Sequence, residues 1–432
     1  MPKFVVEGGH PLRGTIRPAG NKNAALPILA ASLLTDEPVI VENVPDIRDV
    51  RTLLELLRRV GVESEWLERN TVRLHAKEVS AAQLEPELVS RIRASILLAG
   101  PMLARVGRMT LPPPGGDVIG RRRVDTHFLA LSRLGAVVEA AQGYHMETSG
   151  LRGADIFLDE PSVTGTENAI MAAVLAKGTT RLRNAAAEPH VQDLCHFLNS
   201  MGARISGIGT HILEIEGVER LHGTRYRIGS DHIEVGSFIG LAAVTRSEIT
   251  IEDAAVEHLD STLLAFDRLG VRCEIRGRDL YVPADQEMEI RMDMGGHIPK
   301  LDDGPWPAFP ADLTSIALVV ATQCKGTILI HEKMFESRMF FADKVIGMGA
   351  RIVLCDPHRA VVVGPSRLHA GVVESPDIRA GMALLIAALG AEGESHIYNV
   401  GQIERGYERI DERLRALGAR IERHDSRGPY AE

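Results

Sequence analysis

A short pattern that recurs six times along the chain constrains the fold more than any other feature. In each copy a helix-like stretch ends on glycine, and apolar and polar residues then alternate as in a strand. Glycine readily adopts the left-handed conformation that ends many helices, so each copy predicts a helix, a turn and a strand. The copies are between 67 and 79 residues apart, and their glycines are Gly61, Gly135, Gly202, Gly270, Gly349 and Gly418. A repeat of this period predicts six similar structural units.

Five of the six helix-like stretches have an aspartate 7 to 12 residues before their glycine. Carboxylates are favoured at helix N-termini, where they cap free N–H groups and complement the helix dipole. We therefore expect N-caps or first-turn anions at Asp49, Asp125, Asp193, Asp260 and Asp411.

A second helix is expected upstream of each glycine. Its residues are small and apolar on all sides, and a polar turn and an alternating strand follow it. The clear copies are 24–34, 169–176, 313–321 and 382–389, and looser copies lie at 96–103 and 238–244. A helix that is apolar all round is a buried helix. The fold class is therefore α/β, with two helices and several strands in each unit.

The six units divide into two lobes of three. A chain of 432 residues is expected to hold at least two domains. The natural division lies at Gly229 and Ser230, between the third and fourth repeat glycines. A cleft between two such lobes would be a natural ligand site.

Composition excludes several classes of protein. The net charge of −9 argues against a general nucleic-acid-binding protein, which needs a basic surface. The four cysteines lie far apart, so neither a zinc ribbon nor a disulfide framework is expected. No apolar run reaches the ~18 residues that a membrane span needs. The N-terminus lacks the apolar core of a secretory signal. We expect a cytoplasmic protein without membrane insertion.

Several cations and carboxylates stand in settings that suggest anion chemistry. Lys22 opens the first buried helix, where its charge and the backbone N–H groups could bind phosphate. Asp117 lies in a Pro- and Gly-rich loop at 112–123 that could close as a lid. Asp312 precedes another buried helix. The alternatives are a solvated lysine, a solvated charged loop and an N-cap aspartate. The group of His297, Asp302 and Asp303 matches no metal-site spacing, and its members are interpreted as polar loop residues.

Together these segments resemble the UDP-N-acetylglucosamine 1-carboxyvinyltransferases, a family of enolpyruvyl transferases. The resemblance extends to Arg423, and its most specific segments are Lys22-Asn-Ala-Ala-Leu-Pro27 and Arg405-Gly-Tyr-Glu-Arg-Ile410. It implies an inside-out α/β barrel: two lobes of three βαβαββ repeats each, with helices inside. It implies a first lobe of residues 1–20 and 230–432, and a second lobe of residues 21–229 that carries the mobile lid at 112–123.

The resemblance also implies the reaction. Phosphoenolpyruvate would pass its enolpyruvyl group to the 3′-hydroxyl of UDP-N-acetylglucosamine by addition and elimination, without metal or organic cofactor. Its phosphate would be bound by Lys22, Arg122 and Arg405, and its carboxylate would lie near Arg338 and Arg379. The planar guanidinium group suits both anions because it forms paired hydrogen bonds.

The resemblance assigns the proton-transfer steps to two carboxylates. Asp312 would accept the proton of the attacking hydroxyl, and Asp117 occupies the lid position at which most of the family have cysteine as general acid. Fosfomycin alkylates that cysteine in the family, so insensitivity is expected here. Positions that match the family's sugar-nucleotide or other substrate contacts are Asn23, Arg93, Val124, Asp125, His127, Ser162, Val163, Glu188 and Phe335.

The chain departs from the family pattern on the sugar-nucleotide side, at Arg123, Thr164, Ala187 and His190. Two alternatives therefore stay open. One is a paralogue that transfers enolpyruvyl to a different hydroxyl, and the other is a non-catalytic nucleotide-sugar-binding protein on the same fold.

Overall fold

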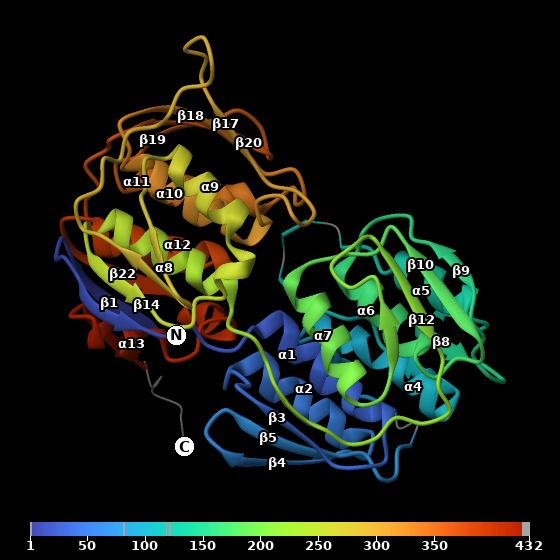
Figure 1. The fold of residues 1–432 in the computed structure, drawn as a ribbon. Helices are drawn as coiled ribbons and strands as arrows, with labels where there is room; N and C mark the ends of the chain where they lie inside the picture. The colour runs from blue at the N-terminus through green and yellow to red at the C-terminus, as the bar shows by residue number, and fades with distance from the viewer. Residues whose placement is uncertain (1, 81–82, 118, 121, 426–432) are drawn as a thin grey trace. The chain divides into compact units, whose positions relative to one another are not determined.

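The computed structural model describes residues 2–80, 83–117, 119–120 and 122–425, and its described residues form two compact units (Figure 1). Unit 1 contains residues 2–19, 119–120 and 230–425, and unit 2 contains residues 20–80, 83–117 and 122–229. The sequence assigns the whole loop 112–123 to the second lobe. Residues 119–120 of this loop group with unit 1, where the N–H of Ser337 donates to the carbonyl of Ile119 at 3.2 Å. Val118 and Arg121 of this loop lie outside the described residues.

Unit 1 has a core of three helices packed on one another: α8 (His232–Val244), α10 (Thr314–Thr322) and α12 (Ile378–Gly390) (Figure 1). All residues of α8 and α10 are buried, as expected for helices that are apolar on every side. The other α-helices of unit 1 are α9 (Asp260–Arg268), α11 (Ala342–Gly347) and α13 (Ile410–Ala416). The described residues of this unit also form four short 3₁₀ helices: η3 (Val256–His258), η4 (Ala311–Leu313), η5 (Arg338–Phe341) and η6 (Val400–Arg405).

Three four-stranded sheets surround this core among the described residues of unit 1. The first has the order β21-β22-β1-β23, from β21 (Val372–Glu374), β22 (Gly393–Tyr398), β1 (Lys3–Gly8) and β23 (Arg420–His424). The second has the order β15-β16-β14-β2, from β15 (Glu274–Arg276), β16 (Asp279–Val282), β14 (Glu248–Ile251) and β2 (Arg13–Ile16). The third has the order β17-β18-β20-β19, from β17 (Lys300–Asp302), β18 (Gly326–His331), β20 (Arg359–Gly364) and β19 (Arg351–Leu354).

Unit 2 repeats this plan. Its inner helices are α1 (Lys22–Ala31), α4 (Ala99–Val106), which continues η2 (Arg93–Leu98), and α6 (Val163–Ala173). Its other helices are η1 (Ser32–Leu34), α2 (Arg48–Arg59), α3 (Pro86–Val89), α5 (Asp125–Arg133) and α7 (Pro189–Ser200).

The described residues of unit 2 also form three sheets. The order β13-β3-β5-β4 joins β13 (Arg225–Arg227), β3 (Val39–Glu42), β5 (Thr71–His75) and β4 (Glu63–Glu68). The order β6-β8-β7 joins β6 (Arg108–Leu111), β8 (Gly143–Glu147) and β7 (Val137–Ala141). The order β11-β12-β10-β9 joins β11 (Arg204–Ser206), β12 (Ile212–Glu216), β10 (Thr179–Arg183) and β9 (Asp155–Phe157).

The α/β repeat architecture is confirmed. All six repeat glycines have positive φ angles, between 74° and 103°, just after a helix, as the turn into the strand requires. Four of the five aspartates lie in the first turn of their helix, but the prediction for Asp193 is wrong. Glu188 and Pro189 begin α7, so Asp193 lies further along and instead accepts hydrogen bonds from the Tyr226 hydroxyl and the Gly229 N–H.

Asp302 and Asp303 also differ from the expectation of a polar loop. Asp302 ends β17, and Asp303 is buried directly after it. Among the helices of the described ranges, none has the length and apolar character needed to cross a membrane.

Candidate functional site

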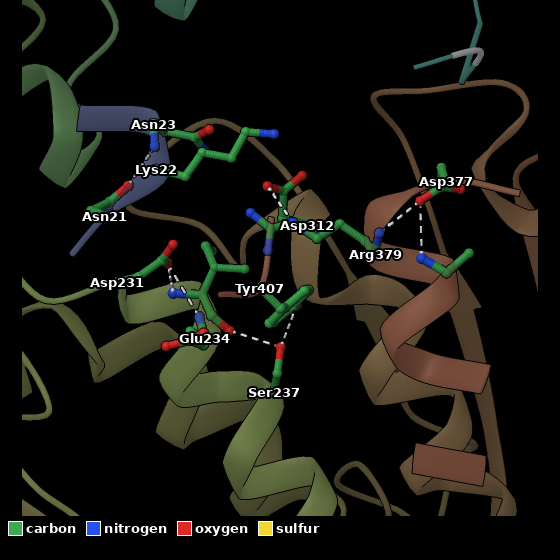
Figure 2. A network of polar contacts seen from close by, with 12 residues as sticks. Asn21, Lys22, Asn23, Asp231, Glu234, Ser237, Asp312, Asp377, Arg379 and Tyr407 are labelled. Carbon is green, nitrogen blue, oxygen red and sulfur yellow. Dashed lines mark hydrogen bonds and ion pairs between the residues drawn. The ribbon is translucent and has the colours of Figure 1, made fainter. Parts of the chain in front are cut away.

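Asp312 is the centre of a buried ion-pair network in unit 1. It lies inside η4, whose N-cap is Pro310, and the N-cap of the following helix α10 is Leu313. Asp312 occupies neither position, so the N-cap alternative is wrong. Its two carboxylate oxygens instead accept hydrogen bonds from two arginines, each at 3.1 Å. Oδ1 accepts from Nη2 of Arg338. Oδ2 accepts from Nε of Arg379 (Figure 2). Three residues that are far apart in the sequence therefore converge here.

Arg379 is held at the N-terminal end of α12. The N-cap Asp377 accepts the backbone N–H groups of Arg379 and Ala380, at 2.8 and 2.9 Å (Figure 2). The guanidinium lies over the ring of Tyr407, 5.3 Å from its centroid. Burial opposes the charge, but Tyr407 and Asp312 outweigh that effect and raise the pKa of Arg379. The Nη1 atom is buried and has no hydrogen-bond partner among the described residues.

Arg338 begins η5 and is 4% exposed. Its Nε lies 3.6 Å from Oε2 of Glu332, and its guanidinium lies 5.1 Å from the ring centroid of Phe335. Burial opposes this charge too, and Asp312 and Glu332 outweigh it, so the pKa of Arg338 is raised. Its Nη1 also lacks a hydrogen-bond partner in the described part of the chain.

This network has the chemistry of an anion site beside a proton acceptor. Arg338 and Arg379 each keep a buried N–H group that finds no acceptor among the residues the structure describes, and buried donors of this kind are costly unless a ligand satisfies them. A planar carboxylate fits such guanidinium donors. The carboxylate of Asp312 lies directly against both cations.

Arg405 ends η6, a segment that packs against α12. The side chain is half-buried, and its Nη1 donates to Oε1 of Gln402 at 2.9 Å. Tyr407 follows two residues later and shares a hydrogen bond of 2.8 Å with Ser237 of α8 (Figure 2). The strongest sequence signature of the resemblance thus lies beside the helix that carries Arg379.

In unit 2, Lys22 begins α1 and is 7% exposed. The Asn21 side chain caps the helix by accepting the N–H of Asn23 (Figure 2) and that of Ala24. The Lys22 ammonium forms an ion pair of 2.8 Å with Asp49, in the first turn of α2. A cation buried at a helix N-terminus is unfavourable, and Asp49 provides the local compensation.

Arg93 joins η2 to the segment that begins at Arg122. Its Nη2 donates to the carbonyls of Arg122 and Arg123, at 2.9 and 2.6 Å. Burial and the neighbouring Arg122 charge lower the pKa of Arg93 to about 10. Two arginines held this close are a feature of anion-binding surfaces.

The loop that carries Asp117 approaches the Arg93 segment closely. A Cβ on Gly115 would lie 1.6 Å from the carbonyl oxygen of Ser90, and Gly116 has a φ of +114° beside Arg93. Both positions therefore require glycine for close approach. Asp117 follows directly and is half-buried. That the loop at 112–123 closes as a lid stays a prediction.

His127 is the centre of a buried network in unit 2. Nδ2 of Asn168 donates to Nδ1 of His127 at 2.8 Å, so Nδ1 is an acceptor. Nε2 lies 3.1 Å from the Thr164 hydroxyl and carries the proton. Burial, reinforced by the Arg93 charge, lowers the pKa of His127 to about 3. His127 is therefore a neutral donor at physiological pH.

The other expected contact residues of unit 2 surround this network. Ser162 caps α6 by accepting the N–H of Gly165 at 3.1 Å, and Val163 is the first residue of that helix. Val124 precedes α5, and Asp125 begins it and pairs with Arg123 at 3.2 Å. The unusual Arg123 and Thr164 are thus both part of hydrogen-bonded structure.

Glu188 lies at the N-cap position of α7, close to the fully buried Glu167 of α6. Burial, and then the charge of Glu188, raise the pKa of Glu167. His190 is also buried, in the first turn of α7.

Several residues of these networks cannot be identified as functional residues from the sequence alone. Asp49 is recognisable only as a first-turn anion, and Asn168 only as a polar residue within an apolar helix. Tyr407 lies within the quoted Arg405–Ile410 segment, although its contact with Arg379 is not visible there. For Glu332, the only indication in the sequence is its position directly after a strand of alternating apolar and polar residues.

Comparisons with known proteins agree with this arrangement. The family model of EPSP synthase (3-phosphoshikimate 1-carboxyvinyltransferase) matches residues 6–414. The chain is 64% identical over 421 residues to a UDP-N-acetylglucosamine 1-carboxyvinyltransferase of Bradyrhizobium diazoefficiens, with 98% of each chain covered. It is 58% identical over 422 residues to the protein of that name from Treponema denticola, covering 98% of this chain and 99% of the relative.

Solved structures show the same fold. The enolpyruvyl transferase NikO from Streptomyces tendae matches with a TM-score of 0.86 and 25% identity, covering 98% of each chain. The EPSP synthase of Acinetobacter baumannii matches with a TM-score of 0.76 and 16% identity, covering 98% of this chain and 100% of that one, and shows the fold alone.

Proposed function

Since the chain belongs to the family of UDP-N-acetylglucosamine 1-carboxyvinyltransferases, we propose that it transfers the enolpyruvyl group of phosphoenolpyruvate to the 3′-hydroxyl of UDP-N-acetylglucosamine. Inorganic phosphate is the second product. This activity would supply peptidoglycan synthesis and so cell-wall growth, shape and division, in the cytoplasm.

The phosphoenolpyruvate carboxylate binds to Arg338 and Arg379 in this proposal. Their unpartnered Nη1 groups are the single observation that carries it, because two buried guanidinium donors need an anion to satisfy them. By the family resemblance, Lys22, Arg122 and Arg405 bind the phosphate. Lys22 is held at the start of α1, and its ammonium supplies positive charge for the phosphate.

Asp312 acts as the general base. The attacking hydroxyl oxygen bonds to C2 of phosphoenolpyruvate while its proton passes to the Asp312 carboxylate. The C3 methylene gains a proton and becomes a methyl group. Phosphate then leaves C2, and loss of a proton from C3 restores the double bond. The two arginines hold Asp312 in place from both sides, which supports this role.

Asp117 supplies the proton to C3. A carboxylic acid donates a proton near neutral pH only where its charged form is disfavoured, so we infer that lid closure and ligand charge act together at this residue. The unit 2 positions Asn23, Arg93, Val124, Asp125, His127, Ser162, Val163 and Glu188, with Phe335 of unit 1, contact the substrates.

The direct test is a phosphate-release assay with both substrates. Phosphate is expected only when phosphoenolpyruvate and UDP-N-acetylglucosamine are present together, with a product heavier than the sugar nucleotide by one enolpyruvyl group. A different hydroxyl acceptor with a higher kcat/KM would favour a paralogue. Binding of the sugar nucleotide without turnover would contradict the proposal.

A further inference from the structure

Two buried carboxyl groups lie behind Arg338, at the ends of neighbouring strands. β17 and β18 pair in parallel, with Asp302 opposite His331. The next residue of each strand is acidic: Asp303 after β17 and Glu332 after β18. The ends of parallel strands meet at the same edge of a sheet, so the two side chains lie together. They are 1% and 0% exposed.

The backbone satisfies one oxygen of each carboxyl group. Oε1 of Glu332 accepts the N–H groups of Met334 and Phe335, at 3.1 and 3.2 Å. Oδ1 of Asp303 accepts the N–H of Lys333 at 2.5 Å. The other two oxygens, Oε2 and Oδ2, are buried and receive no hydrogen bond from an N–H or hydroxyl donor in the described residues.

The two carboxyl groups are neighbours, because Oδ1 of Asp303 binds the N–H of Lys333, the residue that follows Glu332. Two ionised carboxylates buried side by side repel one another, and each would keep an oxygen without a donor, so one proton shared between them removes both costs. Burial first, and then Asp303, raise the pKa of Glu332, which is the direction that retains such a proton.

The pair faces a residue of the proposed site. Oε2 of Glu332 lies 3.6 Å from Nε of Arg338, while Asp312 binds Nη2 of the same guanidinium. We propose that Glu332 and Asp303 share one proton and, as a pair of net charge −1, position Arg338 for the substrate carboxylate. The assignment of a positioning role rests on the proposed function. Glu332 also holds the N–H of Phe335, so the same carboxyl orients both neighbours.

Amide substitutions test the shared proton because an amide imitates a protonated carboxyl. In Asp303→Asn, the side-chain amide can donate to Oε2 of Glu332 and its oxygen can accept the Lys333 N–H. The charge of −1 is kept, so we expect the KM for phosphoenolpyruvate to change by no more than about twofold. In Asp303→Asn/Glu332→Gln the charge is lost, and this KM should rise by at least about tenfold. The KM for UDP-N-acetylglucosamine should stay within about twofold, which a general structural defect would not produce.

Asp302→Asn is the matched control. Asp302 is the neighbouring residue on β17, and it pairs with Lys300 and Lys333 away from Arg338. Its substitution should leave both KM values unchanged. If Asp303→Asn raises the KM for phosphoenolpyruvate as much as the double substitution does, the shared proton is overturned. An unchanged KM in the folded double variant would overturn the positioning role.

Infrared spectroscopy tests the proton without substrate or turnover. At neutral pH the wild-type minus Asp303→Asn difference spectrum should contain the carbonyl stretch of a protonated carboxylic acid. Its absence would overturn the shared proton, even if the double variant does not fold. A wild-type protein that shows this band but releases no phosphate would contradict the proposed function and leave the proton pair established.

Discussion

Oδ2 of Asp312 accepts a hydrogen bond from Nε of Arg379 at 3.1 Å, joining the start of one buried helix of unit 1 to the start of another. Arg379 is 5% exposed and lies at a helix N-terminus, where a cation is disfavoured. The carboxylate compensates this charge. The proposed base and the proposed carboxylate-binding arginine are therefore parts of one network, and a change in either should affect both binding and chemistry.

Asp312→Asn should remove the proton acceptor while keeping the shape of the side chain. We expect kcat to fall by about 10²- to 10⁴-fold, the usual contribution of a general base. Phosphate release measures the effect, and circular dichroism reports whether the fold is kept. Asp343→Asn, on the exposed side of α11, is the control. Near-normal kcat in a folded Asp312→Asn protein would contradict the assignment.

Arg379→Lys should keep the charge but lose the planar guanidinium. Lysine cannot contact Asp312 and a substrate carboxylate with the same geometry, so we expect the KM for phosphoenolpyruvate to rise by about tenfold or more. Steady-state kinetics with varied phosphoenolpyruvate measure it. Arg367→Lys, at an exposed ion pair with Glu392, provides the comparison and should have a normal KM. Equal KM values in the two variants would exclude a direct contact.

Asp117→Asn should abolish most turnover, because an amide cannot donate the proton that C3 requires. A fall in kcat of about 10²-fold or more is expected, with smaller changes in substrate binding. Single-turnover phosphate release is the measurement. Retention of near-normal turnover would show that another group is the general acid.

Fosfomycin should leave the wild-type protein active, because a carboxylate is a poorer nucleophile than the thiolate found at this position in most of the family. Asp117→Cys should introduce time-dependent inactivation and a covalent gain in mass, seen by intact-protein mass spectrometry. Labelling of the wild type would refute the prediction. Cys355, which is exposed, serves as the internal control for non-specific alkylation.

The free energy of unfolding should fall below about pH 6.5. The buried His127 has a pKa of about 3, against an ordinary value of 6.5. Between these values the unfolded chain binds a proton that the folded chain does not, so acid favours unfolding. The contribution is up to about 1.4 kcal/mol per pH unit. Urea denaturation between pH 7.5 and 5 measures it.

His127→Gln should flatten this dependence, whereas His222→Gln, at an exposed position, should not. His232 of α8 is expected to add a similar slope, since burial and the neighbouring His258 lower the pKa of His232 to about 3. A His127→Gln protein with an unchanged slope would contradict the account.

Local sequence patterns were sufficient to predict the repeat architecture. Each repeat glycine follows a helix, and the run at 313–321 corresponds to a helix whose residues are all buried. The failures occurred where a residue's role depends on distant partners. Asp193 has the spacing of a helix cap but binds Tyr226. Asp303 looks like a loop residue, yet the parallel pairing of β17 and β18 buries it beside Glu332.

By itself, the sequence determined the two-helix repeat, its six copies and the set of cations and carboxylates available for chemistry. These properties depend on periodicity and on the backbone preferences of glycine, which act over a few residues. Only the tertiary structure decided that Arg338 and Arg379 bind opposite oxygens of Asp312 and that Asp303 and Glu332 lie together. The physical reason is that burial and pairing of charges depend on which strands and helix ends meet, and residues far apart in the chain supply the partners.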